Sequence, residues 1–168
     1  ILIGSLAVVG LLHDLKLRAQ AERDLQASRS LLESILDHTP AIVFIKDLGG
    51  RYLFANRRFE QMVGQHRAGI YGKTAFDLVA KELATTAQEH QQKVLAVQGP
   101  VEFEEIIQGP DGPRQHLAIK FPLRDGNGKI YATAGISTDI TARKKAEAER
   151  DRFFTLSLDL LCFPGRCD

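Results

Sequence analysis

The sequence predicts an α+β domain in which one antiparallel sheet carries helices on a single face. Strand-like runs occur as a pair, a mainly helical stretch follows, and three more strand-like runs complete the domain. Gly- and Asp-rich turns join neighbouring runs as hairpins, whose strands pair antiparallel. Helices packed on one face of such a sheet bury the apolar sides of both elements, so this architecture is the natural solution.

The amino-terminal segment is apolar. Residues 1–12 read ILIGSLAVVGLL, and polar and basic residues begin at His13. A bilayer-spanning helix needs about 20 apolar residues, so we expect residues 1–14 to be the end of a truncated transmembrane or other apolar helix. The basic flank indicates the cytoplasmic side of the inner membrane for the parent protein, while this fragment itself is expected to be soluble. A buried segment that packs on the domain or on a partner is the alternative.

A linker helix is predicted over residues 15–38, which contain no Gly or Pro and are rich in Leu, Ala, Gln, Glu and Arg. Its apolar and small residues recur at steps of four and three, at Ala21, Leu25, Ser28, Leu32 and Ile35. Such a narrow seam is typical of two parallel helices in a coiled coil and favours a homodimer through the flanking helices. Packing of the same face on the chain's own domain explains so short a seam equally well.

The domain is expected to begin with a hairpin. Residues 42–47 and 51–56 are strand-like, and Leu48-Gly49-Gly50 between them supplies the turn. Asn56 is placed to cap a short helix over residues 57–63, because its side-chain oxygen can accept a hydrogen bond from a free backbone N–H.

The middle of the domain is expected to be mainly helical. Residues 64–72 have no regular pattern, and residues 75–79 are compatible with one helical turn. A longer helix is predicted over residues 81–97, with Gly99-Pro100 ending it.

Three strands are predicted to complete the domain. In residues 101–107, Val101, Phe103 and Ile107 share one face, while Glu102 and Glu104 point to the other. In the next two strands, alternation predicts two apolar faces: Leu117, Ile119 and Phe121 in the first, and Ile130, Ala132, Ala134 and Ile136 in the second. Turns at residues 110–113 and 125–128 join these strands.

Composition argues against several classes of function. The chain has 168 residues, enough for one cored domain with helical extensions, and its 22 basic and 21 acidic residues predict no nucleic-acid partner. Cys162 and Cys167 both lie in the last seven residues, so neither a disulfide framework nor a metal site is predicted. The dinucleotide-binding, P-loop, metalloprotease and nucleophile-elbow motifs are all missing, as is the phospho-acceptor His box. We therefore expect no enzymatic activity in this chain, although its parent could be a histidine kinase.

Three segments together resemble the PAS family of sensory domains. They are Gly72–Leu78 (GKTAFDL), Gly99–Glu105 (GPVEFEE) and Gly135–Thr141 (GISTDIT), and they occur in the family's order. The resemblance implies the PAS fold, with a five-stranded antiparallel sheet in the order 2-1-5-4-3, over residues 39–141. Residues 142–168 would then form a signalling helix and the start of a truncated second PAS repeat.

The resemblance also implies a ligand pocket, because PAS domains enclose a cavity between the sheet and the long helix. The residues expected to line it are Phe44, Phe54, Asn56, Phe59, Phe76, Val94, Phe103, Ile119, Phe121 and Ile136. The nearest polar candidates are Lys46, Arg51 and Tyr52. A fully packed core without a ligand is the alternative.

Cofactor-bearing PAS relatives give little support for haem or flavin here. Light-sensing flavin relatives carry a reactive Cys in a region that corresponds to residues 64–69, which contain none. Haem-binding relatives use a His on the long helix, but His90 stands too close to Gly99 for that pattern. Non-covalent flavin or a small metabolite stays open.

The resemblance finally implies a signal relay where the last strand meets the outgoing helix, at Asp139, Ile140, Thr141 and Arg143. Asp139 and Thr141 carry short side-chain oxygens that can satisfy free N–H groups at a helix start. In the family this Asp pairs with a nearby basic residue, and Arg143 or Lys144 is within reach.

We therefore expect a non-catalytic sensory and dimerisation module that passes a signal to a downstream output domain of the kinase type. A ligand-free dimerisation spacer and a haem- or flavin-bearing gas or redox sensor are the alternatives.

Overall fold

The computed structural model describes the backbone of residues 2–109 and 112–161, and the side chains of residues 13–108 and 112–155. The chain divides into two units, Ile1–Thr39 and Pro40–Asp168, each of which is described by itself. The two cysteines, part of the turn at residues 110–113 and the end of the expected second repeat lie outside the described residues.

The first unit is one helix, α1 (Leu2–His38). The helix predicted for residues 15–38 is therefore present and is continuous with the apolar segment before it. The seam residues Leu25, Leu32 and Ile35 are 72%, 57% and 57% exposed. Within the described parts of the chain, no helix combines the length and apolarity needed to cross a bilayer.

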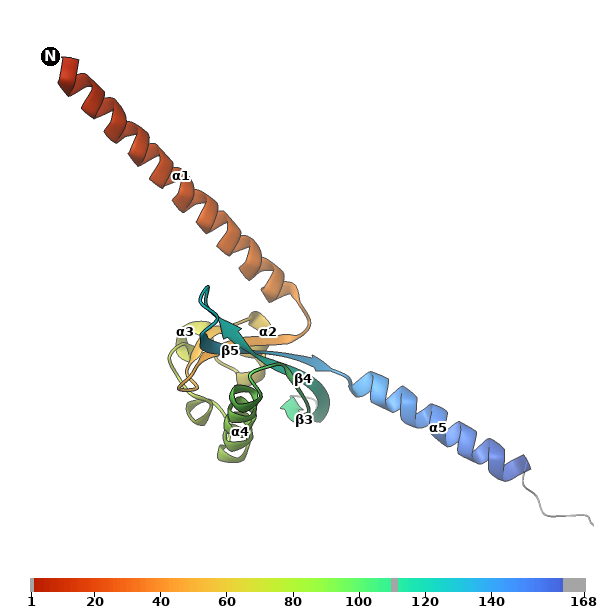
Figure 1. Ribbon diagram of the computed structural model, residues 1–168. Coiled ribbons are helices and arrows are strands. Elements are labelled where there is room, and N and C mark those ends of the chain that lie inside the picture. The colour runs from red at the N-terminus through yellow and green to blue at the C-terminus, as the bar shows by residue number, and fades with distance from the viewer. Residues whose placement is uncertain (1, 110–111, 162–168) are drawn as a thin grey trace, which may run out of the picture. The chain divides into compact units, whose positions relative to one another are not determined.

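The second unit is built on a five-stranded antiparallel sheet (Figure 1), with the order β2-β1-β5-β4-β3. Its strands are β1 (Ile42–Asp47), β2 (Tyr52–Ala55), β3 (Val101–Gly109), β4 (Gly112–Arg124) and β5 (Ile130–Asp139). The predicted α+β class and strand order are both confirmed. A bulge between Ile45 and Lys46 places Lys46 opposite Tyr52.

The helices between β2 and β3 are α2 (Arg57–Val63), α3 (Arg67–Ile70), the 3-10 turn η1 (Ala75–Asp77) and α4 (Lys81–Val97). The irregular segment expected at residues 64–72 thus contains the short helix α3. Asn56 caps α2, as predicted, by accepting a hydrogen bond from Phe59 N at 3.1 Å. The outgoing helix is α5 (Thr141–Leu161).

The helix α4 has the bounds predicted from the sequence, residues 81–97. Gln98, with φ 55°, takes the left-handed conformation at its carboxyl end and donates its N–H to Val94 O. Gly99 was expected in that role.

The apolar sets predicted for β4 and β5 do not face the helices. His116, Ala118 and Lys120 are the buried positions of β4, whereas Ile119 is 37% exposed. In β5, Ala132 and Ala134 of the predicted set are buried, as are Gly135 and Ser137 of the other face, but Ile136 is 40% exposed. Ile119 and Ile136 pair directly across the two strands on the face opposite the helices. The prediction failed because the helix-covered face carries polar residues where a plain core would carry aliphatic ones.

Candidate ligand site and sheet-helix junction

A cavity of about 470 Å³ lies between the sheet and the helical elements α2, η1 and α4. Its apolar lining includes Ile42, Phe44, Phe59, Met62, Leu83 and Ile107. Its polar lining includes Lys46, Tyr52, Thr86, His90, Glu105, Lys120 and Ser137. Small-molecule sites have this size and this make-up, an apolar wall with a few converging polar groups.

One side of the cavity depends on the absence of a side chain at Gly135. Gly135 pairs with Phe44 across β1 and β5, and a Cβ at Gly135 would come closer than 3.0 Å to the Phe44 ring. The ring can therefore lie against the sheet and contact its aromatic neighbours, with centroid distances of 5.9 Å to Tyr52 and 5.8 Å to Phe59. Gly135 thus fixes how far Phe44 reaches into the cavity.

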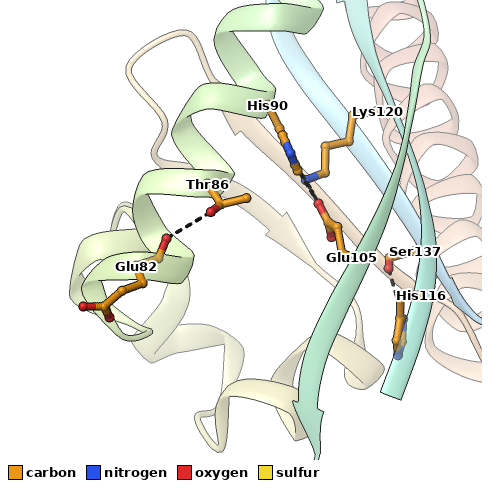
Figure 2. Close-up of polar contacts among 7 residues, drawn as sticks. All are labelled: Glu82, Thr86, His90, Glu105, His116, Lys120 and Ser137. Carbon is orange, nitrogen blue, oxygen red and sulfur yellow. Dashed lines mark hydrogen bonds and ion pairs between the residues drawn. The ribbon is translucent and has the colours of Figure 1, made fainter. Parts of the chain in front are cut away.

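Three polar side chains from different elements converge in the cavity (Figure 2). Lys120 Nζ in β4 donates a hydrogen bond to Glu105 Oε1 in β3 at 2.5 Å. His90 Nδ1 in α4 lies 2.8 Å from the same carboxylate oxygen and 3.0 Å from Lys120 Nζ. It can donate to the carboxylate or accept from the ammonium, depending on its tautomer. The His90 ring also stacks on Phe103, with 3.7 Å between centroids.

Burial keeps both histidines of this face neutral near pH 7. Burial lowers the pKa of His90, and the nearby Lys120 ammonium lowers it further. Burial likewise lowers the pKa of His116, although Asp139 and Glu105 act in the opposite direction. His116 Nδ1 lies 3.1 Å from Ser137 Oγ, as Figure 2 also shows.

Lys46 is in an electrostatically unfavourable environment, because its ammonium is largely removed from water. The residue is only 4% accessible, and its Nζ lies 4.6 Å from the Tyr52 ring centroid and 5.3 Å from that of Phe44. Burial lowers its pKa to about 8, with a further contribution from Lys120 and partial compensation by Glu105. Burial and Glu105 also raise the pKa of the Tyr52 hydroxyl.

The structure brings part of the expected pocket together. Phe44 and Phe59 line the cavity, as do the polar candidates Lys46 and Tyr52. Val94 is fully buried and lines a smaller adjoining void with Phe44 and Lys46. Phe103 lies on the same face, stacked on His90.

The remaining expected pocket residues lie elsewhere. Phe54, Ile119, Phe121 and Ile136 occupy the opposite face of the sheet, because their register partners are Ile45, Ile136, Ala134 and Val43. Phe76 is 49% exposed. Asn56 is fully buried, but its side chain holds the backbone: it accepts from Val43 N at 3.0 Å and donates to Ala41 O at 2.9 Å. Arg51 is exposed and donates to Gly72 O.

Sequence reasoning missed His90, Glu105 and Lys120 as members of one site. The alternation that put Val101, Phe103 and Ile107 on one face also put Glu105 there, so this carboxylate was detectable. Lys120 was not, because Ile119 and Phe121 on either side form the more apolar set. Across the described part of the chain, no cluster of three or more His, Cys, Asp or Glu has the geometry to hold a metal ion.

The junction between β5 and α5 is held by Asp139 and Thr141. Asp139 accepts a hydrogen bond from Thr141 N at 2.9 Å and a second one from Arg114 Nη1 at 2.9 Å. Hydrogen bonds from Thr141, followed by that from Arg114, hold the pKa of Asp139 well below its usual range. Ile140 N donates to Gln115 O at 2.8 Å, which ties the connection to β4.

Two expected contacts of the junction are corrected by the structure. Thr141 Oγ1 accepts from Gln115 N of β4 at 2.9 Å, so this side chain joins the helix start to the sheet. The basic partner of Asp139 is Arg114 of β4, whereas Arg143 pairs with Glu147 within α5. Lys144 pairs with Glu104 of β3 at 2.8 Å. Long-range contacts of this kind cannot be read from separation along the chain.

Comparisons with known proteins agree with this architecture. Residues 36–145 match the family model described as PAS fold. Aerobic respiration control sensor protein ArcB of Escherichia coli (strain K12) is 28% identical over 124 residues, which are 73% of this chain and 16% of that protein. Methanogenesis regulatory histidine kinase FilI of Methanothrix harundinacea (strain 6Ac) is 28% identical over 136 residues, 79% of this chain and 15% of that protein. The solved structure of VqmA bound to DPO is 31% identical, with a TM-score of 0.56, and covers 64% of this chain and 55% of that one.

Proposed function

Because the chain belongs to the PAS family, we propose that it is a non-catalytic sensory and dimerisation module of a kinase-type signalling protein. The chain spans only 16% of the length of ArcB and 15% of that of FilI. In the proposed arrangement, the output domain would be a separate part of the parent protein. The basic residues that follow the apolar start of the chain support a parent protein held at the cytoplasmic side of the inner membrane. The apolar start of α1 would contribute to that attachment.

This proposal depends mainly on the fact that strand β5 runs from the cavity wall to the start of α5. Ser137 of β5 lines the cavity, and Asp139, two residues further on the same face, bonds Thr141 at the start of α5. A ligand that displaces β5 therefore acts on the first turn of α5 through two residues of strand and the hydrogen bond between Asp139 and Thr141. The ligand would change the populations of two sheet-helix arrangements by the difference between its affinities for them.

A second path runs through β3. Glu105 faces the cavity and bonds Lys120, whereas its neighbour Glu104 faces the other side and bonds Lys144 of α5. Strands β3 and β5 thus each contact α5 through a glutamate or aspartate side chain, and each also contributes residues to the cavity wall. This arrangement supports a coupling role for Asp139, Ile140, Thr141 and Arg143, with Arg114 added as the basic partner.

A small molecule in the cavity is part of this proposal. The relative VqmA is described as bound to DPO, and the cavity here has a volume in the range of small-molecule sites. A packed spacer without ligand would have filled this space with aliphatic side chains rather than with buried Lys and Glu.

The dimer would form through α1. Its seam residues Leu25, Leu32 and Ile35 are more than half exposed in the single chain, which leaves them open to a second copy. Substitution of Leu25→Glu should therefore shift the chain toward monomer in sedimentation experiments. Arg29→Glu, on the same helix outside the seam, serves as the control.

The relay is tested in the parent protein with Asp139→Ala. Loss of two hydrogen bonds at the junction should alter signalling output and the ligand response, with a stability loss of about 1 kcal/mol. Asp151→Ala, at an exposed position of α5, is the matched control. Unchanged output and an unchanged ligand response in Asp139→Ala would contradict the relay.

A further inference from the structure

The Lys46 side chain is buried at the cavity wall, and within the described part of the chain its ammonium has no carboxylate as a hydrogen-bond or ion-pair partner. It is 4% accessible, it lines the cavity, and its printed neighbours are the faces of Phe44 and Tyr52. Among the residues that the structure describes, no carboxylate forms a hydrogen bond or ion pair with it. A buried charge of this kind is costly unless an opposite charge or a hydrogen-bond acceptor compensates it.

The other charges around the cavity leave Lys46 uncompensated. Two glutamates border the cavity, and Glu105 is bonded to Lys120 and to His90. The side chain of Glu104 leaves β3 in the other direction, and its carboxylate pairs with the Lys144 ammonium at 2.8 Å, so these two charges compensate each other. His90 and His116 are neutral near pH 7 because burial lowers the pKa of each, and Tyr52 keeps its proton because burial raises its pKa. The groups that face the cavity therefore sum to one net positive charge, from Lys46.

We propose that the cavity binds a small organic monocarboxylate, whose carboxylate group bonds Lys46 Nζ and whose apolar body packs against Phe44, Phe59 and Met62. This inference rests on the proposed sensory role of the cavity and gives the chemical class of its ligand. A carboxylate supplies the single negative charge that the cavity lacks and the acceptor atoms that Lys46 needs. A cation would be repelled by Lys46, and a highly charged phosphate ester would exceed the one positive charge available.

The apolar part of the ligand follows from the composition of the wall. Phe44, Phe59, Met62 and Leu83 contribute side chains without hydrogen-bonding N or O atoms to the cavity wall. Burial of a hydrocarbon body against this wall would contribute about 25 cal/mol per Å² of apolar surface removed from water. Short hydrophilic acids would lack that contribution, so aryl or medium-chain acids are the better candidates.

The experiment is a calorimetric titration of the full chain with phenylacetate and with hexanoate, each compared with its neutral amide, phenylacetamide or hexanamide. A charge-assisted hydrogen bond to a buried ammonium predicts that the acids bind roughly 10- to 100-fold more tightly than the amides. Lys46→Met should abolish that preference, because it keeps the length of the side chain and removes the charge. Lys93→Met, at an exposed position of α4, is the control and should keep the preference.

Proton uptake gives a second readout that a merely structural lysine would not produce. The pKa of Lys46 is lowered to about 8, so a carboxylate that binds at pH 8 should raise it and draw in roughly half a proton per molecule bound. The uptake is measured by repeating the titration in two buffers with different ionisation enthalpies. It should vanish in Lys46→Met and persist in Lys93→Met.

Equal affinity for acids and amides, or no binding of either acid, would overturn the proposed ligand class. Acid binding that Lys46→Met leaves unchanged would also overturn it. These results leave the sensory proposal to be judged separately, since Asp139→Ala tests the relay through the signalling output of the parent protein. Unchanged output in Asp139→Ala with acid binding intact would contradict the sensory proposal instead.

Discussion

Replacement of Lys46 by Met should stabilise the second unit and change how its stability depends on pH. The pKa of Lys46 falls from 10.5 to about 8 on folding. Near pH 7, the charged form therefore costs the folded state about 3 kcal/mol, at about 1.4 kcal/mol per pKa unit. The variant loses the interactions with the Phe44 and Tyr52 rings, worth about 0.5–2 kcal/mol together. The net gain in the free energy of unfolding should be about 1–3 kcal/mol at pH 7.

The sign of the pH effect follows from proton binding. Between pH 8 and 10.5 the unfolded chain keeps the Lys46 proton more than the folded chain does, so a rise in pH favours folding. The wild-type free energy of unfolding should gain about 2 kcal/mol from this group between pH 7 and 9.5, and Lys46→Met should lack that gain. Above pH 10 the raised pKa of Tyr52 acts in the opposite direction, because the unfolded tyrosine ionises first.

Urea denaturation followed by near-ultraviolet circular dichroism measures these quantities. The chain has no Trp and three Tyr, namely Tyr52, Tyr71 and Tyr131, and all three lie in the second unit. The signal therefore reports on the sheet and not on α1. Parallel pH profiles for wild type and Lys46→Met would refute the reasoning, because they would show that Lys46 ionises alike in the folded and unfolded chains.

Three further outcomes follow from contacts described above. Gly135→Ala should lower the free energy of unfolding by about 1–3 kcal/mol, since its methyl group displaces the Phe44 ring, whereas Gly126→Ala, with open space around it, should be nearly neutral in the same urea titration. Asn56→Ala should cost about 2–3 kcal/mol, because it leaves buried backbone groups of β1 and the start of α2 without partners; a loss below 0.5 kcal/mol in chemical denaturation would contradict this. The depressed pKa of Asp139 means that its contribution is present above about pH 4 and is lost as pH falls further. The protection factor of Thr141 N, its exchange rate relative to an unstructured peptide at the same pH, should therefore fall on acidification in wild type but not in Asp139→Asn.

Local signals in the sequence were sufficient for most elements of the fold. Asn56 followed by a helix-forming run gave the cap of α2, and Gly and Asp residues gave the hairpin turns, because each depends on neighbours along the chain. The sheet order came from the family resemblance, since alternation does not say which strands are neighbours. The end of α4 was predicted at the correct residue, but the left-handed residue that follows it is Gln98 rather than a glycine.

The candidate site was harder to predict for a physical reason. A sheet face that lines a polar cavity inverts the usual pattern, so Lys120 and His116 were buried while Ile119 and Ile136 were exposed. The sequence carried one warning, Glu105 between Phe103 and Ile107 on a face assigned to the core. A charge at such a position needs a partner, and the partner is Lys120 of the adjacent strand. The residue directly opposite Glu105 in the register is His116, so this contact between side chains could not be deduced from the strand pattern.

The two consecutive glutamates of β3 have a mechanical consequence. Their side chains leave the strand in opposite directions, Glu105 toward Lys120 and Glu104 toward Lys144 of the outgoing helix. If β3 rotates about its own axis, the carboxylates of Glu105 and Glu104 move in opposite directions. A molecule that competed for Lys120 would weaken the contact of Glu105 and would thereby change the contact between Glu104 and Lys144. The position of α5 could thus respond to a rotation of one strand, without a hinge in the sheet.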